Sequence, residues 1–141
     1  MAGKKILIVD DNEVVLTTLS MKLKSKSYMV FTAKDGSEAV AAVRREKPDL
    51  ILLDIGFPPE MTGVPWDGFR IIQWLRRIHE AINTPIIIMS GADASKYKDR
   101  ALSEGAIAYF QKPINNDELI AAINRALNND NGVKPEDKAA A

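Results

Sequence analysis

Five short hydrophobic runs recur along the chain, and a longer segment with helical periodicity follows each of them. Within a run, the odd-numbered and the even-numbered positions are both apolar. This is typical of parallel strands that helices cover on both faces, because a strand in a sheet open to solvent on one side alternates apolar with polar residues. The pattern therefore predicts five βα units and an α/β fold. The expected strands are residues 6–9, 29–31, 50–53, 85–89 and 106–110.

The segments between these runs carry apolar stripes at helical spacing. We expect Ser37 to cap the second helix, which should end before Pro48 because the residue preceding a proline disfavours helix. Gly105 is placed to end the fourth helix, and Asn115 or Asn116 to begin the last. The expected inner faces are Val15, Leu19 and Leu23; Phe69, Ile72, Leu75 and Ile78; and Leu119, Ile120, Ile123 and Leu127.

Composition narrows the class of protein. The chain has 141 residues, 46% hydrophobic and 27% charged, which suits one globular domain over residues 1–128 with a polar tail at 129–141, in part a cloning remnant. A formal net charge of +0 without a long run of like charges predicts no nucleic-acid partner. With no cysteine and no apolar run long enough to cross a bilayer, we expect a cytoplasmic protein without a membrane partner. We further expect a monomer or a weak dimer.

Acidic residues follow two of the predicted strands. Asp10 and Asp11 end the first run, and Asp54 ends the third. A doubly wound parallel sheet, of the flavodoxin-like order 2-1-3-4-5, brings these strand ends to one rim and leaves a crevice where the strand order reverses. Because carboxylates held close together repel, such an array recruits a cation or keeps a carboxyl group protonated. Oxygen ligands without histidine or cysteine favour a hard ion, and Mg²⁺ suits a shallow site best.

Two more polar residues reach the same rim. Ser90 follows the fourth run, and Lys112 follows the fifth, just before Pro113. A hydroxyl, an ammonium group and a divalent cation together can hold phosphoryl oxygens during transfer. Asp54 can supply the nucleophile, because carboxylates form acyl phosphates.

Four segments, ILIVDD, PDLILLDIGFP, PIIIMSG and GAIAYFQKPI, resemble in this order and spacing the receiver domain of bacterial response regulators. The resemblance covers about residues 4–127. It implies a Mg²⁺-dependent transfer of a phosphoryl group from a phosphohistidine, on a sensor kinase or a histidine phosphotransfer protein, to Asp54. Self-catalysed hydrolysis would follow, so the protein would be a signalling phosphoacceptor and not an enzyme. A downstream protein would bind the fourth helix, fifth strand and fifth helix.

The resemblance assigns a role to each site residue by its position in these motifs. The resemblance implies that Asp54 is phosphorylated, that Asp11 binds Mg²⁺ directly, that Asp10 acts mainly through metal-bound water, and that Gly56 offers its backbone carbonyl to the metal.

The same resemblance makes Ser90 the hydroxyl that bonds the phosphoryl group and moves inward afterwards. It makes Lys112 the lysine that pairs with a phosphate oxygen, and Tyr109 the aromatic residue that changes rotamer with Ser90. The bond between Lys112 and Pro113 is expected to be cis.

One segment departs from the family pattern. Residues 59–66 lengthen the loop between the phosphoacceptor strand and the next helix, and they add prolines and Trp66. This loop is expected either to contact a partner or cover Asp54, or to be an ordinary loop with Trp66 packed as an anchor.

Three alternatives stand beside this interpretation. A degenerate receiver would act as an unphosphorylated interaction module, which the intact set of acidic, hydroxyl and lysine residues disfavours. A haloacid dehalogenase-type hydrolase needs a second aspartate where Gly56 stands, and a flavin or dinucleotide binder would not place the acidic residues DDNE after the first strand. Because no output domain follows Leu127 in this sequence, we expect signalling by protein contact, with a fragment of a longer protein as the alternative.

Overall fold

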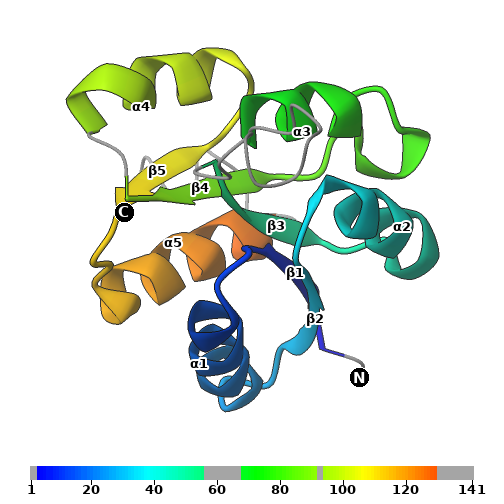
Figure 1. Cartoon of the computed structure of the whole chain (residues 1–141). Coiled ribbons are helices and arrows are strands. Elements are labelled where there is room, and N and C mark those ends of the chain that lie inside the picture. Colours follow the sequence, from blue (N-terminus) through cyan, green and yellow to red (C-terminus); the bar gives the residue numbers. More distant parts are fainter. Residues whose placement is uncertain (1–2, 56–67, 92–93, 130–141) are drawn as a thin grey trace.

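The computed structural model describes residues 3–55, 68–91 and 94–129, and Figure 1 shows their arrangement. Strands and helices alternate along this part of the chain. In order, the elements are β1 (Lys5–Val9), α1 (Glu13–Lys24), β2 (Met29–Ala33), α2 (Gly36–Glu46), β3 (Leu50–Asp54), α3 (Gly68–Leu75), the 3-10 helix η2 (His79–Ala81), β4 (Ile86–Ser90), α4 (Ala94–Ser103), β5 (Ala108–Gln111) and α5 (Asn116–Asn129).

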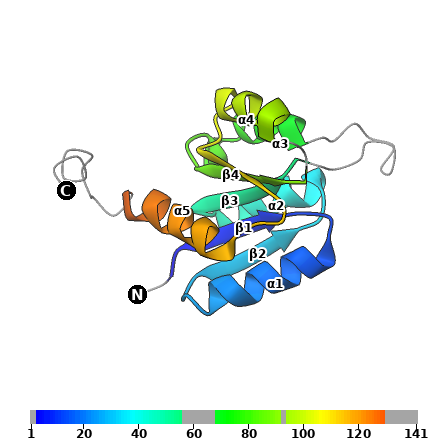
Figure 2. The ribbon, with the colours of Figure 1, turned by 90° about the vertical axis from the view of Figure 1, so that its left-hand side faces the viewer.

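The five strands form one parallel sheet in the order β2-β1-β3-β4-β5. Helices α1 and α5 pack on one face, while α2, α3 and α4 pack on the other (Figure 2). The predicted α/β class, strand order and helix number are therefore confirmed. None of the helices in the described ranges is long and apolar enough to cross a membrane.

Covering both faces explains the uniformly apolar strands. In β1, Leu7 and Val9 join the core beneath α2, α3 and α4, whereas Ile6 and Ile8 join the core beneath α1 and α5. All four side chains are fully buried. Successive side chains of a strand point to opposite faces of the sheet. When helices cover both faces, every position of the strand is therefore apolar up to the edge of the sheet where the strand ends.

One local prediction was wrong. Asp35, not Ser37, caps α2: its side chain accepts a hydrogen bond from the Glu38 backbone amide at 2.8 Å. Ser37 already lies in the first turn, where a side-chain cap has no role. On α1, Leu19 and Leu23 are buried and Val15, half-buried, packs against the same core as expected, but Leu16 is also buried there and was not predicted. The spacing of three and then four residues from Leu16 follows the 3.6-residue turn more closely than two steps of four, so Val15 lies nearer the edge of the buried face.

The other helix limits agree more closely with the sequence. Asn115 accepts hydrogen bonds from the Asp117 and Glu118 amides at 2.9 and 3.1 Å, as a residue preceding α5 should. Ile78 is buried as expected, although α3 ends at Leu75. Gly105 has a φ of 107°, a conformation that favours glycine, and it lies two residues beyond the end of α4.

Candidate functional site

Three carboxylates meet at the carboxyl end of the sheet. Val9 of β1 pairs in register with Leu53 of β3, so the residues that follow them are neighbours. One side-chain oxygen from each of Asp10, Asp11 and Asp54 lies within 4.8 Å of the others. Asp10 is fully buried and Asp54 nearly so, whereas Asp11 is exposed. Two carboxylates of the cluster are therefore buried, and the third is open to solvent.

Asp10 is held by both of its carboxylate oxygens. Its Oδ1 accepts a hydrogen bond from the Asn12 backbone amide at 2.9 Å, and its Oδ2 accepts one from Lys112 Nζ at 2.9 Å. Its own amide donates to the Ala33 carbonyl at 3.0 Å, which continues the pairing of β1 with β2. A buried carboxylate needs such partners, and they leave Asp10 less available than Asp11 as a direct metal ligand.

Lys112 joins β5 to the acidic cluster. Its Nζ lies 2.9 Å from Asp10 Oδ2 and 3.3 Å from Asp54 Oδ2, and its backbone amide donates to the Ser90 carbonyl at 2.7 Å. Burial works against the charged form of Lys112, but its hydrogen bonds to the two carboxylates and their negative charges outweigh burial and raise its pKa. The residue therefore carries a full charge at neutral pH. The peptide bond from Lys112 to Pro113 is cis, as expected.

The cluster as a whole is negative. Three carboxylates and one ammonium group add to a formal charge of −2. Carboxylate oxygens are the ligands that a hard divalent cation prefers, and the exposed Asp11 with the rim-facing Asp54 can take up such an ion without breaking the bonds of Asp10. The donor set fits Mg²⁺.

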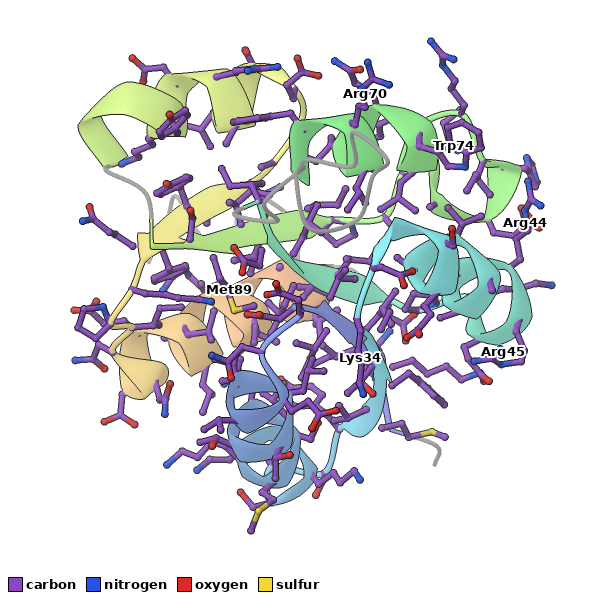
Figure 3. The ribbon with its side chains drawn as sticks, in the orientation of Figure 1. Lys34, Arg44, Arg45, Arg70, Trp74 and Met89 are labelled. Atoms are coloured by element: carbon purple, nitrogen blue, oxygen red, sulfur yellow. The ribbon has the colours of Figure 1, made fainter. Side chains whose placement is uncertain are left out.

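Ser90 and Tyr109 lie on the other side of this rim. Asp54 pairs in register with Met89, and Figure 3 shows Met89 near α5, in the core shared with α1. Ser90 is fully buried and comes one residue later, so alternation assigns it to the opposite face. Tyr109, which pairs in register with Ile88, is half-buried and packs on that face too. The rim thus places its charged groups towards α1 and α5, and its hydroxyl and tyrosine towards α3 and α4.

One residue of the site was missed at the level of sequence. The backbone amide of Asn12 donates a hydrogen bond to Asp10 Oδ1. The Asn12 side chain accepts hydrogen bonds from the Val14 and Val15 amides at 2.9 and 3.2 Å, which caps α1. An asparagine just before a helix is a recognisable cap signal. The sequence contains no signal for its contact with Asp10, which depends on how the chain turns after β1. The expected roles of Gly56 and of the loop at 59–66 lie outside the described residues.

Comparison with known proteins agrees with this geometry. The family model of the response regulator receiver domain matches residues 6–124. A curated relative, the alkaline phosphatase synthesis transcriptional regulatory protein PhoP of Bacillus subtilis (strain 168), is 36% identical over 125 residues, which are 89% of this chain and 49% of that protein. The chain therefore spans about half the length of this relative.

Solved structures of similar chains have the same fold. The chemotaxis protein CheY4 of Vibrio cholerae is 28% identical with a TM-score of 0.78, and the match covers 89% of this chain and 99% of that one. The receiver domain of the sensor histidine kinase PA1611 from Pseudomonas aeruginosa PAO1 is 30% identical with a TM-score of 0.77, covering 90% and 99% of the two chains. That structure has a magnesium ion coordinated in its active site cleft.

Proposed function

Because this chain belongs to the family of response regulator receiver domains, we propose that it takes up a phosphoryl group on Asp54 in a Mg²⁺-dependent reaction and signals to a protein partner. The family acts in signalling together with histidine kinases and downstream effectors. The observation that supports the proposal most directly is the placement of the Asp54 carboxylate between two further carboxylates and the Lys112 ammonium group, on one rim of the sheet.

The proposed reaction moves a phosphoryl group between two nucleophiles. A carboxylate oxygen of Asp54 attacks the phosphorus atom of a phosphohistidine on a sensor kinase or a histidine phosphotransfer protein. The new O–P bond forms as the P–N bond breaks, and the imidazole nitrogen keeps the electron pair. In the later hydrolysis, water attacks the phosphorus atom, the O–P bond to Asp54 breaks, and inorganic phosphate leaves while the carboxylate is restored.

The chain's own groups stabilise this transfer. Lys112 can exchange its 3.3 Å contact with Asp54 Oδ2 for a phosphoryl oxygen while it keeps its bond to Asp10. The Ser90 hydroxyl, which lies on the other side of the rim, would move inward and donate a hydrogen bond to a second phosphoryl oxygen. When bound, Mg²⁺ offsets the negative charge that carboxylates and phosphoryl oxygens bring together. Its proposed ligands are Asp11, Asp54 and the Gly56 carbonyl, with Asp10 acting through water.

The switch is proposed to start from Ser90 and Tyr109. Both belong to the face of the sheet on which α4 packs. Among the described side chains of α4, Ala101 is fully buried, the Arg100 guanidinium stacks 3.9 Å from the centre of the Phe69 ring, and the Tyr97 ring lies 6.3 Å from that of Phe69. Movement of Ser90 and Tyr109 would then alter the surface of α4, β5 and α5 that a partner binds.

Two further expectations stay proposals. We take residues 1–128 as the domain, acting in the cytoplasm. We also expect deletion of residues 59–64 to change partner choice or phosphoryl lifetime; measuring both for the deletion variant would test whether this loop takes part.

The direct test is phosphorylation by a small donor. The chain is incubated with acetyl phosphate and Mg²⁺ and its intact mass is measured, for the wild type and for Asp54→Asn. We expect one phosphoryl adduct on the wild type and none on Asp54→Asn. Asp49→Asn is a matched control, because Asp49 precedes the same strand at its opposite end, and it should keep the adduct. An unmodified wild type would instead support an interaction module that works without phosphorylation.

A further inference from the structure

The edge of the sheet at β2 presents backbone groups that β1 does not use. The Met29 amide donates to the Lys4 carbonyl at 2.9 Å, and the Ala33 carbonyl accepts from the Asp10 amide at 3.0 Å. In a parallel pair, alternate residues direct both backbone groups to the same neighbour. Met29, Phe31 and Ala33 therefore bond to β1, while Val30 and Thr32 direct their N–H and C=O groups away from it. Among the described strands, none lies on that side of β2.

A groove runs along this edge. It has a volume of about 520 Å³ and lies between β2 and the flank of α1 that faces away from Lys112. Leu16, Val30 and Met21 give it apolar patches, and Thr17, Ser20 and Thr32 give it hydroxyl groups. Such a floor suits the side chains of an extended strand, which alternate in direction and would enter the groove at every second residue.

The charges beside the groove select the partner. Lys24, in the last turn of α1, stands towards one end. Lys34, which Figure 3 labels, stands towards the other end and forms an ion pair with Glu13. The Lys34 end of the groove is balanced by two carboxylates, because Lys34 pairs with Glu13 and its backbone amide donates to Glu38 Oε1 at 2.9 Å. The positive charge therefore gathers at the other end, where Lys24 lines the groove and Lys22 lies in the last turn of α1. Lysines beside a strand edge discourage pairing with a basic strand, so a strand that carries carboxylates matches this end better.

We infer that the β2 edge binds an extended, acidic segment of a partner protein, which adds to the sheet as a sixth strand. The segment would pair with the amides and carbonyls of Val30 and Thr32, place alternate apolar side chains against Leu16 and Met21, and place a carboxylate near Lys24. This surface lies apart from Asp54, so it could hold a partner whether or not the phosphoryl group is present.

The test uses a peptide probe of about eight residues that alternates valine and glutamate, added to the isotopically labelled full chain and followed by amide NMR. We expect the Val30 and Thr32 amides to shift and to gain protection from hydrogen exchange, while the Phe31 amide, already bonded to β1, gains none. A matched peptide of valine and lysine should bind more weakly. Equal binding of the two peptides, or no change at Val30 and Thr32, would overturn the inference.

Variants separate backbone pairing from charge. Thr32→Pro removes an outward N–H without touching the bonds to β1, and it should weaken the peptide about tenfold or more. Lys24→Glu should weaken it about fivefold at low ionic strength, whereas Lys26→Glu, in the turn after α1, is the matched control and should change it little. If the same amides shift with protein concentration alone, the occupant is a second copy of the chain, and the partner proposed here is wrong.

Discussion

The two ends of the sheet hold their charged groups in different ways. At the carboxyl end, Lys112 bonds to the side chains of Asp10 and Asp54. At the amino end, Arg76 donates through Nη1 to the Ala81 and Thr84 carbonyls at 2.9 and 2.7 Å and through Nη2 to the Gly105 carbonyl at 3.2 Å. Burial lowers the pKa of the Arg76 guanidinium, yet all these partners are backbone groups.

Asp49 follows the same rule at the amino end. Its Oδ2 accepts a hydrogen bond from the Lys5 amide at 2.7 Å, and its own amide donates to the Lys5 carbonyl at 2.7 Å. Backbone partners cannot move unless the strands and turns that carry them move, so these charges brace the fold. Side-chain partners at the carboxyl end can be exchanged for a metal ion or a phosphoryl oxygen while the strands stay in place. The difference separates a structural end from a reactive end.

Removing the brace should have the largest effect on stability. Arg76→Ala removes the side-chain donor from four carbonyls in two separate turns, those of Ala81, Ile82, Thr84 and Gly105. We expect a loss of about 3 kcal/mol in the free energy of unfolding, measured with urea. Arg76→Lys should lose about half as much, because one ammonium group cannot reach every carbonyl.

Arg77→Ala is the control for this substitution, since Arg77 is exposed and next in sequence. Arg76→Ala should still accept a phosphoryl group from acetyl phosphate under conditions where it is folded. A stability close to that of the wild type would mean that the amino end is not braced by this guanidinium group.

At the reactive end, Lys112→Met should cost less, and the cost should depend on the metal ion. The substitution leaves the buried Asp10 with one backbone donor and removes the cation between it and Asp54. We expect a loss of about 2 kcal/mol without Mg²⁺, below the value for a fully buried ion pair because Lys112 is partly exposed. Saturating Mg²⁺ should recover much of it, which thermal unfolding with and without the ion would measure. A loss independent of Mg²⁺ would make Lys112 a brace like Arg76.

The sheet and its reactive end were accessible from the sequence because both follow from strand periodicity. Once the parallel strands are placed, their carboxyl ends lie along the same edge of the sheet. Asp10, Asp54 and Lys112 therefore come together, whatever the conformation of the loops. The contact of Lys112 with Asp10 was not expected, since the family pattern assigns this lysine to a phosphate oxygen. Without a phosphoryl group, the nearest negative charges take that place.

The structural end could not be predicted in the same way. Arg76 and Arg77 are adjacent and chemically identical, and only the point at which α3 ends decides which of them turns towards the carbonyls. The cap of α2 presents a similar choice between Asp35 and Ser37, settled by a difference of two residues in where the helix begins. Such features depend on exact helix ends, which periodicity defines only to within a residue or two.

A smaller change of opposite sign is expected from Asp11→Asn. The other charges of the cluster, from Asp10, Asp54 and Lys112, add to −1, so removing the exposed carboxylate relieves repulsion and should stabilise the metal-free protein by about 1 kcal/mol. The same substitution should reduce the rise in melting temperature that Mg²⁺ gives the wild type. Asp117→Asn, at an exposed position in the first turn of α5, is the control. A metal-free variant less stable than the wild type would show that Asp11 supports the fold.

The smallest effect should appear at alkaline pH. The folded state raises the pKa of Lys112 above its usual 10.5, so the charged lysine adds stability that is complete below that value and is lost as the pH rises through the folded-state pKa. The Arg76 guanidinium keeps its charge in this range, so the loss should come from the reactive end. We expect about 0.5 kcal/mol or less, because Lys112 is partly exposed. Urea unfolding on both sides of pH 10.5, for the wild type and Lys112→Arg, would measure it: the arginine variant should lose less, and equal losses would place the titrating group elsewhere.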